Sequence, residues 1–122
     1  MPETAKHTGG CHCGRVRYEV ETDLGMVLSC NCSICTKRGA LWTYVGLDQF
    51  TLLSGKDELS DYQFNKQVIH HLFCRNCGVG SFSTGQGEDG SEGIGINVRC
   101  LDDVDIETLT LTPYDGKTLL PE

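Results

Sequence analysis

The spacing of eight cysteines in a chain of 122 residues constrains this protein more than any other feature. They form a Cys-x-Cys pair, a Cys-x-Cys-x-x-Cys run, a Cys-x-x-Cys pair and one isolated residue, in chain order Cys11, Cys13, Cys30, Cys32, Cys35, Cys74, Cys77 and Cys100. Short spacings of this kind bring two or three sulfurs to one metal ion. We therefore expect the cysteines mainly to bind zinc rather than to form disulfides.

The rest of the composition favours a cytoplasmic protein that keeps its thiols reduced. The chain has no run of about 18 apolar residues that would span a membrane, and residues 1–7 lack the apolar core of a signal peptide. The net charge is −7 and no basic run occurs. Because binding to nucleic acid or to an anionic membrane depends on positive charge, we expect neither as a partner. The sequence does not indicate the oligomeric state.

The pattern of apolar residues predicts one mainly β domain over residues 1–122. The 15 glycines and 3 prolines suit many turns, and short alternating runs predict strands. The expected strands are 15–20, 41–45, 50–53, 68–73, 80–83, 94–98 and 109–112. Short helical turns are expected at 33–38 and 103–109, and an exposed glycine-rich loop at 83–95. This pattern favours a folded β-sandwich or barrel; an α+β domain is the alternative.

Two of the cysteine pairs together make one complete zinc site. Cys11 and Cys13, two apart on an extended chain, would present both thiols on one side. Cys74 and Cys77 would close a tight turn, with Gly78 at a positive φ. Four thiolates fill a tetrahedral shell, so we expect a structural zinc here.

The remaining run places three thiols, Cys30, Cys32 and Cys35, within six residues. Three protein ligands and one open position is how catalytic zinc is usually held, so we expect a catalytic zinc at these three residues. The alternative is that Cys100 or a histidine completes the shell, which would make both sites structural. A redox dithiol is disfavoured because no thioredoxin-like βαβ pattern surrounds either Cys-x-x-Cys.

Histidine and basic residues near the cysteines have simpler interpretations. His70 and His71 point in opposite directions on an expected strand, so we expect one to be packed and the other exposed. We expect His12 to face solvent. Lys37 and Arg38 either form a solvated basic pair or attract an anionic substrate.

The large aromatic residues are expected in the core, and the acidic residues near the C-terminal end on the surface. The expected core aromatics are Trp42, Tyr44, Phe64, Phe73 and Phe82. The acidic residues are Asp102, Asp103 and Asp105, which suit a solvated loop or a helix start.

Four motifs taken together resemble one known family. They are Gly-Gly-Cys-His-Cys-Gly at 9–14, Cys-Asn-Cys-Ser-Ile-Cys at 30–35, Phe-Cys-Arg-Asn-Cys-Gly at 73–78 and Asn-Val-Arg-Cys-Leu-Asp-Asp at 97–103. Their order and spacing closely resemble the glutathione-dependent formaldehyde-activating enzyme family, which includes the centromere protein V type of domain. The resemblance covers roughly residues 8–116. It implies an Mss4-like fold of β-sheets around zinc.

The resemblance also implies two zinc ions per chain and an activity. The structural zinc would lie at Cys11, Cys13, Cys74 and Cys77. The catalytic zinc would lie at Cys30, Cys32 and Cys35, with a carbon–sulfur lyase activity that joins glutathione and formaldehyde into S-hydroxymethylglutathione. Our hypothesis is that the second zinc binds a substrate thiol and presents it to a small aldehyde. The alternative is a non-catalytic zinc module that binds a protein partner.

Overall fold

The computed structural model describes residues 4–63, 69–86 and 92–115. About half of these residues lie in short strands, and one short α-helix, α1 (Ser33–Arg38), follows the third strand. The strands are β1 (Ala5–Gly10), β2 (Arg17–Thr22), β3 (Val27–Cys30), β4 (Trp42–Gly46), β5 (Phe50–Ser54), β6 (Leu59–Tyr62), β7 (His71–Cys74), β8 (Phe82–Gln86), β9 (Glu92–Asn97) and β10 (Leu111–Tyr114). Single 3-10 turns are η1 (Leu47–Gln49), η2 (Lys56–Glu58), η3 (Val98–Cys100) and η4 (Ile106–Thr108).

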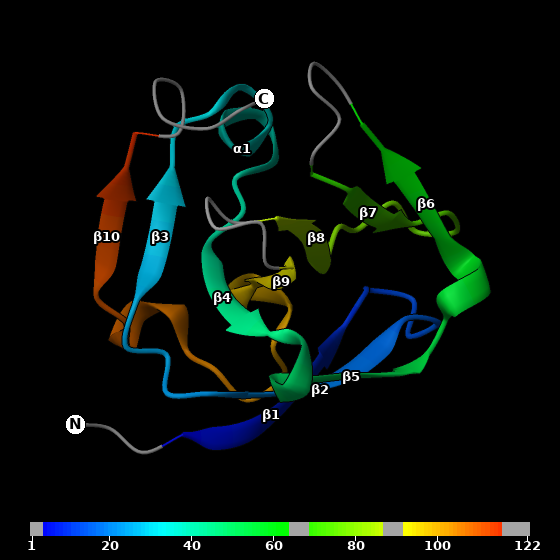
Figure 1. Cartoon of the computed structure of the whole chain (residues 1–122), viewed down its shortest axis with the longest axis horizontal. Helices are drawn as coiled ribbons and strands as arrows, with labels where there is room; N and C mark the ends of the chain where they lie inside the picture. Colours follow the sequence, from blue (N-terminus) through cyan, green and yellow to red (C-terminus); the bar gives the residue numbers. More distant parts are fainter. Residues whose placement is uncertain (1–3, 64–68, 87–91, 116–122) are drawn as a thin grey trace.

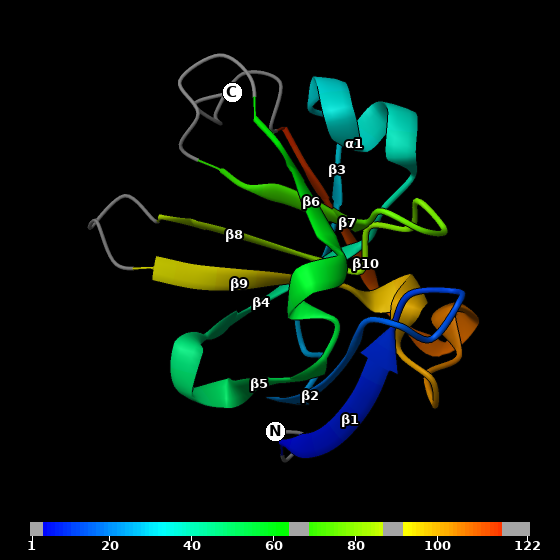
Figure 2. The same ribbon diagram turned by 90° about the vertical axis from the view of Figure 1, so that its right-hand side faces the viewer.

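The strands form three sheets that fold over one another. The first has the order β1-β2-β5, the second β10-β3-β4-β9-β8, and the third pairs β6 with β7. All pairs are antiparallel except β10 with β3. Figure 2 shows the first sheet lying across one end of the second. The expected mainly β, Mss4-like folded architecture is confirmed, and in the described part of the chain no sheet closes into a barrel.

An aromatic cluster packs the first sheet against the second. Three alternating side chains of the segment expected to form a strand are fully buried: Val16, Tyr18 and Val20. The Tyr18 ring lies 5.2 Å from that of Phe50 and 5.7 Å from that of Phe82, measured between centroids. Its hydroxyl donates a hydrogen bond to the Ser81 carbonyl at 3.0 Å. The buried phenol therefore has a partner, as a buried polar group requires.

The sequence prediction of a loop at 83–95 is wrong at both of its ends. Residues 82–86 form β8 and residues 92–97 form β9, and the two strands pair with Gly85 opposite Gly93; residues 87–91 lie outside the described part. Gly95 explains why a glycine-rich segment forms a strand here. A Cβ at Gly95 would lie 3.2 Å from the Tyr44 ring and 3.4 Å from the Trp42 ring. The glycine makes room for two aromatic rings on the same face of the sheet.

The other local predictions hold in part. The helical turn at 33–38 is α1, whereas the turn at 103–109 is only η4, whose start is capped by the Asp105 carboxylate. Trp42 and Phe82 are buried and Phe73 is half-buried, but Tyr44 is 57% exposed, so its placement in the core was wrong. Phe64 lies outside the described residues, as does the start of the strand expected at 68–73. No helix among the described residues has the length and apolar character needed to cross a bilayer.

Candidate metal centres

Four cysteines from two distant parts of the chain meet between β1 and β7. Cys11 and Cys13 lie in the turn that follows β1, Cys74 ends β7 and Cys77 lies in the next turn. Their four sulfurs all lie within 4.8 Å of one another. Sγ of Cys13 lies 3.6 Å from Sγ of Cys11 and 3.6 Å from that of Cys74. The four cysteines that were grouped from their spacing in the sequence therefore lie together in the fold.

The backbone around these four cysteines is tightly turned. Residues 11–14 form a turn, in which the Gly14 N–H donates to the Cys11 carbonyl at 3.3 Å, so the extended conformation expected for this pair was wrong. On the other side, Gly78 has φ +81° and its N–H donates to the Cys74 carbonyl at 2.8 Å. The positive φ predicted for Gly78 is confirmed, and it lets the chain reverse directly after Cys77.

Hydrogen bonds favour the thiolate form of Cys13 and Cys77 in this cluster, whereas the pKa of Cys74 is raised. Burial opposes ionisation of Cys77, but the backbone N–H groups of Val79 and Cys13 outweigh it and lower the pKa of that thiol to about 6. The Asn76 side chain and the Arg15 backbone likewise lower the pKa of Cys13. Thiolates are the form that binds metal.

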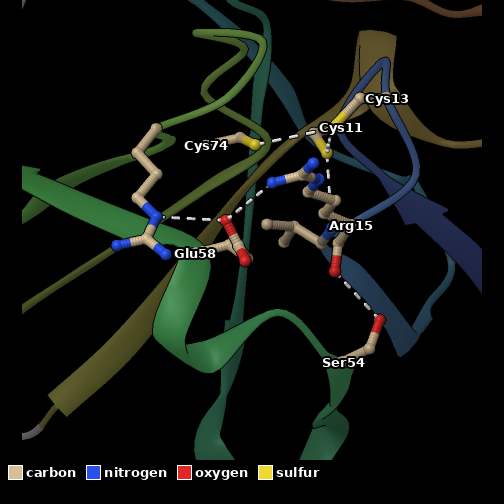
Figure 3. A network of polar contacts seen from close by, with 8 residues as sticks. Cys11, Cys13, Arg15, Ser54, Glu58 and Cys74 are labelled. Carbon is tan, nitrogen blue, oxygen red and sulfur yellow. Dashed lines mark hydrogen bonds and ion pairs between the residues drawn. The ribbon is translucent and has the colours of Figure 1, made fainter.

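An ion-pair network adjoins the four-cysteine cluster. The Glu58 carboxylate accepts hydrogen bonds from Arg75 Nε at 3.1 Å and from Arg15 Nη1 at 3.4 Å. These two partners, Arg75 first, hold the pKa of Glu58 below its usual range. Ser54 Oγ donates to the Arg15 carbonyl at 3.1 Å. Figure 3 shows the network next to Cys74, whose sulfur points toward Cys11 and Cys13. The network links η2 to the two turns that carry the cysteines.

The second cluster lies at the end of the second sheet, where α1 connects β3 to β4 (Figure 1). Cys30 ends β3, Cys32 immediately precedes α1 and Cys35 lies within it. The three sulfurs lie within 4.8 Å of one another. Cys32 and Cys35 are buried and Cys30 is half-buried. One strand end and one helical turn thus bring the three thiols together.

Two N–H groups point at the sulfurs of this three-cysteine cluster. The backbone N–H of Cys32 donates to Sγ of Cys30 at 3.4 Å, and the indole Nε1 of Trp42 donates to Sγ of Cys35 at 3.1 Å. Burial nevertheless raises the pKa of both Cys32 and Cys35. A cation bound among these buried thiols would favour their ionised form.

Tyr44 presents a hydroxyl on the same side of the sheet. It lies two residues after Trp42 on β4, and both rings flank Gly95. Desolvation of the hydroxyl and the nearby charges of Cys35 and Cys30 raise the pKa of Tyr44. The phenol therefore stays protonated at neutral pH and can donate a hydrogen bond.

No fourth ligand completes the three-cysteine cluster within the residues that the structure describes. Cys100, the alternative fourth ligand, lies instead near the other cluster. Its thiol is half-buried, and burial, together with the charges of Cys11 and Cys77, raises its pKa to about 11. All eight cysteines are free of disulfides.

The histidines follow the simpler interpretation. His71 is buried, whereas His70 is partly exposed and forms a 2.6 Å hydrogen bond with Asp61. His12 faces solvent. Within the described residues, neither metal-type cluster includes a histidine.

Both donor sets fit zinc. Thiolates are ligands that zinc prefers, and two sulfurs bound to one tetrahedral zinc lie about 3.8 Å apart, given Zn–S bonds of about 2.3 Å. The sulfur separations of 3.6 Å in the four-cysteine cluster approach that value. The first cluster provides four ligands and the second provides three. The residues present could therefore bind two metal ions.

Sequence reasoning missed three residues around the second cluster. Trp42 and Tyr44 were expected only as core residues. Arg38 was named together with Lys37, either as a solvated basic pair or as groups that attract an anionic substrate, and its half-buried position was not foreseen. Nothing in the sequence indicates that the indole of Trp42 reaches Cys35, because that contact depends on how β4 packs beside α1. For Arg38, its position three residues after Cys35 was the available signal, since residues so spaced share one helix face.

The fold and the two clusters define a class: small, mainly β proteins in which one complete and one incomplete set of cysteines can bind metal. The chain belongs to the glutathione-dependent formaldehyde-activating enzyme family, whose model matches residues 6–114. The family assignment made from the motifs is confirmed. The chain is also similar to a Rhodobacter sphaeroides protein whose crystal structure comes from Northeast Structural Genomics. The two are 34% identical with a TM-score of 0.77, over 88% of this chain and 98% of the other.

Proposed function

We propose that this protein is a carbon–sulfur lyase-type enzyme that forms or cleaves a thiol adduct at the three-cysteine cluster. Glutathione and formaldehyde are the proposed substrate pair, and the reducing cytoplasm is the proposed location. The observation that carries the proposal is the contrast between the clusters. In the described part of the chain, one has four converging thiols and the other has three, with no further side chain to fill the set.

The two clusters would have different roles, one in stabilising the fold and the other in the reaction. Zinc held by Cys11, Cys13, Cys74 and Cys77 would be structural, because four ligands leave no position for substrate. Cys30, Cys32 and Cys35 would hold the second zinc with one position left for a substrate sulfur. When bound there, zinc supplies a positive charge that lowers the pKa of an incoming thiol and keeps it as the nucleophilic thiolate.

The reaction is an addition across a carbonyl. The substrate S–H bond breaks, the sulfur pair forms a bond to the aldehyde carbon, and the carbonyl π pair moves to oxygen, which takes up a proton. The Tyr44 hydroxyl is our candidate for a donor to that oxygen, since it is protonated and lies close enough to the cluster to respond to the charges of its thiolates. In reverse, the same group takes the proton back while the carbon–sulfur bond breaks.

The chain's own hydrogen bonds would hold the metal ligands in place. Trp42 Nε1–H bonds to Sγ of Cys35, and the Cys32 N–H bonds to Sγ of Cys30. Hydrogen bonds to ligand atoms orient the ligands and reduce their charge. These two hydrogen bonds would therefore help to orient Cys30 and Cys35 toward a bound metal.

Zinc content and activity measured together test the proposal. Protein purified under reducing conditions should contain two zinc ions per chain by elemental analysis and native mass spectrometry. Cys30→Ser should lose one zinc and the ability to form S-hydroxymethylglutathione from glutathione and formaldehyde, which NMR can follow. Cys100→Ser is the matched control, because this cysteine belongs to neither cluster, and it should keep both zinc ions and the activity.

Two results would contradict the proposal. Full activity in Cys30→Ser without the second zinc would show that the reaction does not need this site. Two zinc ions in the natural protein, without any uptake of a thiol at the second, would instead favour a non-catalytic zinc module.

A further inference from the structure

The guanidinium of Arg38 has one buried nitrogen with no hydrogen-bond partner among the described residues. Arg38 ends α1, three residues after Cys35, and it is half-buried whereas Lys37 is exposed. Its Nη1 is buried and makes no hydrogen bond to the described residues. Buried guanidinium nitrogens nearly always have an acceptor, because an unpaired one costs free energy. The unpaired Nη1 therefore calls for an explanation.

The end of the Arg38 side chain lies against Gly80. A Cβ at Gly80 would lie 2.8 Å from Arg38 Nη1 and 3.2 Å from its Cζ, so the side chain occupies the space that a larger residue would take. Gly80 has no positive φ, so backbone conformation does not require a glycine there. Its carbonyl accepts a hydrogen bond from Asn97 Nδ2 at 3.1 Å, which anchors this segment to the end of β9. The missing side chain at Gly80 thus leaves space that the end of the Arg38 side chain occupies.

The charges around Arg38 leave it uncompensated. Burial lowers its pKa, and the only opposing influence among the described residues is the charge of the Cys35 thiolate. No hydrogen bond joins the two residues, although a sulfur would accept one at suitable distance. A guanidinium beside a thiol-binding site, with no acceptor for its Nη1 among the described residues, fits an acceptor that comes with the substrate.

Building on the proposed function, we propose that Arg38 binds a carboxylate of the thiol substrate whose sulfur lies at the three-cysteine cluster. A guanidinium matches a carboxylate through paired N–H groups, which gives geometric specificity as well as strength. Residues three apart on a helix have their Cβ atoms about 5–6 Å apart. One substrate can therefore reach both residues, and the substrate class is a thiol that also carries a carboxylate, as in cysteine-containing peptides, rather than a neutral thiol.

Binding of two matched thiols to the zinc-loaded protein tests Arg38. The probes are N-acetylcysteine and N-acetylcysteine amide, which differ in the carboxylate, and titration calorimetry gives both Kd values. The natural protein should prefer the acid by about tenfold or more, as expected for a charge-assisted pair. In Arg38→Met, which keeps the apolar part of the side chain, the acid-to-amide preference should disappear. Comparing this ratio between variants cancels the intrinsic difference between the two thiols.

Two further variants separate a specific contact from net charge. Lys37→Met makes the same charge change one residue away on an exposed side chain, and it should change the preference by less than about twofold. Gly80→Ala keeps the charge but places a methyl group 2.8 Å from the position of Nη1, so the guanidinium would have to shift and the preference should also fall. The melting temperature of Arg38→Met should not fall, because the change removes a donor that has no partner.

The outcomes distinguish this inference from the proposed function. If the natural protein binds both thiols at the second zinc equally well, Arg38 is not a carboxylate-binding residue, although the thiol site stands. If Arg38→Met binds both thiols more weakly by the same factor and has a lower melting temperature, Arg38 has a structural role instead. If the natural protein binds neither thiol with both zinc ions present, the proposed function fails, and the role of Arg38 fails with it.

Discussion

The indole nitrogen of Trp42 donates a hydrogen bond to the sulfur of Cys35 across 3.1 Å, between β4 and α1. Both residues are buried, and Cys32 and Ala40 pack against them in a small apolar cluster. The three-cysteine cluster is therefore attached to the sheet by the Trp42 side chain as well as by the backbone. A hydrogen bond to a ligand sulfur stabilises its ionised form and fixes its direction.

Removing this hydrogen bond should weaken the second metal site alone. In Trp42→Phe the ring remains apolar and nearly fills the same space, but the donor is lost. We expect zinc affinity at the three-cysteine cluster to fall about tenfold, as for other groups that support metal ligands. Competition with a chromogenic chelator measures this, and the four-cysteine cluster serves as the internal reference. An equal loss at both clusters would point to general damage to the fold.

The Tyr44 hydroxyl should matter for turnover and not for metal content. Tyr44→Phe keeps the ring that packs on Gly95 and removes the proton donor. We expect kcat for glutathione and formaldehyde to fall about 100-fold, the lower end for loss of a general acid, with two zinc ions retained. An unchanged kcat would indicate that water supplies the proton and that Tyr44 takes no part in the reaction.

Two glycines next to the four-cysteine cluster should respond very differently to alanine. At Gly10 the new Cβ would lie 2.0 Å from the Val16 carbonyl oxygen, so the paired backbone would have to move. At Gly78 nothing lies within 4 Å, and only the positive φ opposes a side chain. We expect Gly78→Ala to reduce the free energy of unfolding by about 1–2 kcal/mol and Gly10→Ala by more than about 3 kcal/mol. Urea unfolding of both variants measures this, and the reverse order would contradict the packing at Gly10.

An ion pair should contribute to acid sensitivity. The Asp102 carboxylate accepts hydrogen bonds from Arg17 and from Thr8 Oγ1, the latter at 2.8 Å, and these hold its pKa below the usual range. A lowered pKa in the folded state means that the stabilisation is present at neutral pH. It is lost as pH falls through that pKa, below about pH 4.

Asp102→Asn tests this pH dependence. The free energy of unfolding should fall by about 1 kcal/mol at pH 7, since the pair is partly exposed. The difference from the natural protein should shrink as the pH is lowered below about 4. Thermal unfolding from pH 7 to pH 3 measures both effects. A constant difference at every pH would show that the charge of Asp102 is not what stabilises the fold.

The sequence predicted those parts of the fold and site that depend on local spacing. The cysteine spacings correctly indicated which thiols come together, and the turn at 33–38 is α1. The strands β1, β3 and β6 were missed. β3 has only four residues, and β1 carries exposed polar residues and two glycines, so neither has a strong alternating pattern. β3 pairs with a strand far away in the chain, β10, and Gly9 of β1 forms an isolated bridge with Leu101.

The missed parts of the site depend on long-range packing. The contact of Arg38 with Gly80 joins segments that are far apart in the chain, and the contact of Trp42 with Cys35 depends on the angle at which α1 leaves the sheet. Neither leaves a periodic or spaced signal in the sequence. Tyr44 was placed in the core because aromatic residues usually are, whereas its position on β4 exposes it beside the cluster.

The indole beside Cys35 is also the chain's single tryptophan. Its emission therefore comes from one place in the molecule, within hydrogen-bond distance of a sulfur that is a proposed metal ligand. Loading of that cluster with metal, oxidation of its thiols and arrival of a substrate would each change the surroundings of the indole. The tryptophan of the unlabelled protein is thus a fluorescent reporter of the three-cysteine cluster. The four-cysteine cluster has no tryptophan beside it, so events there do not contribute a signal of their own.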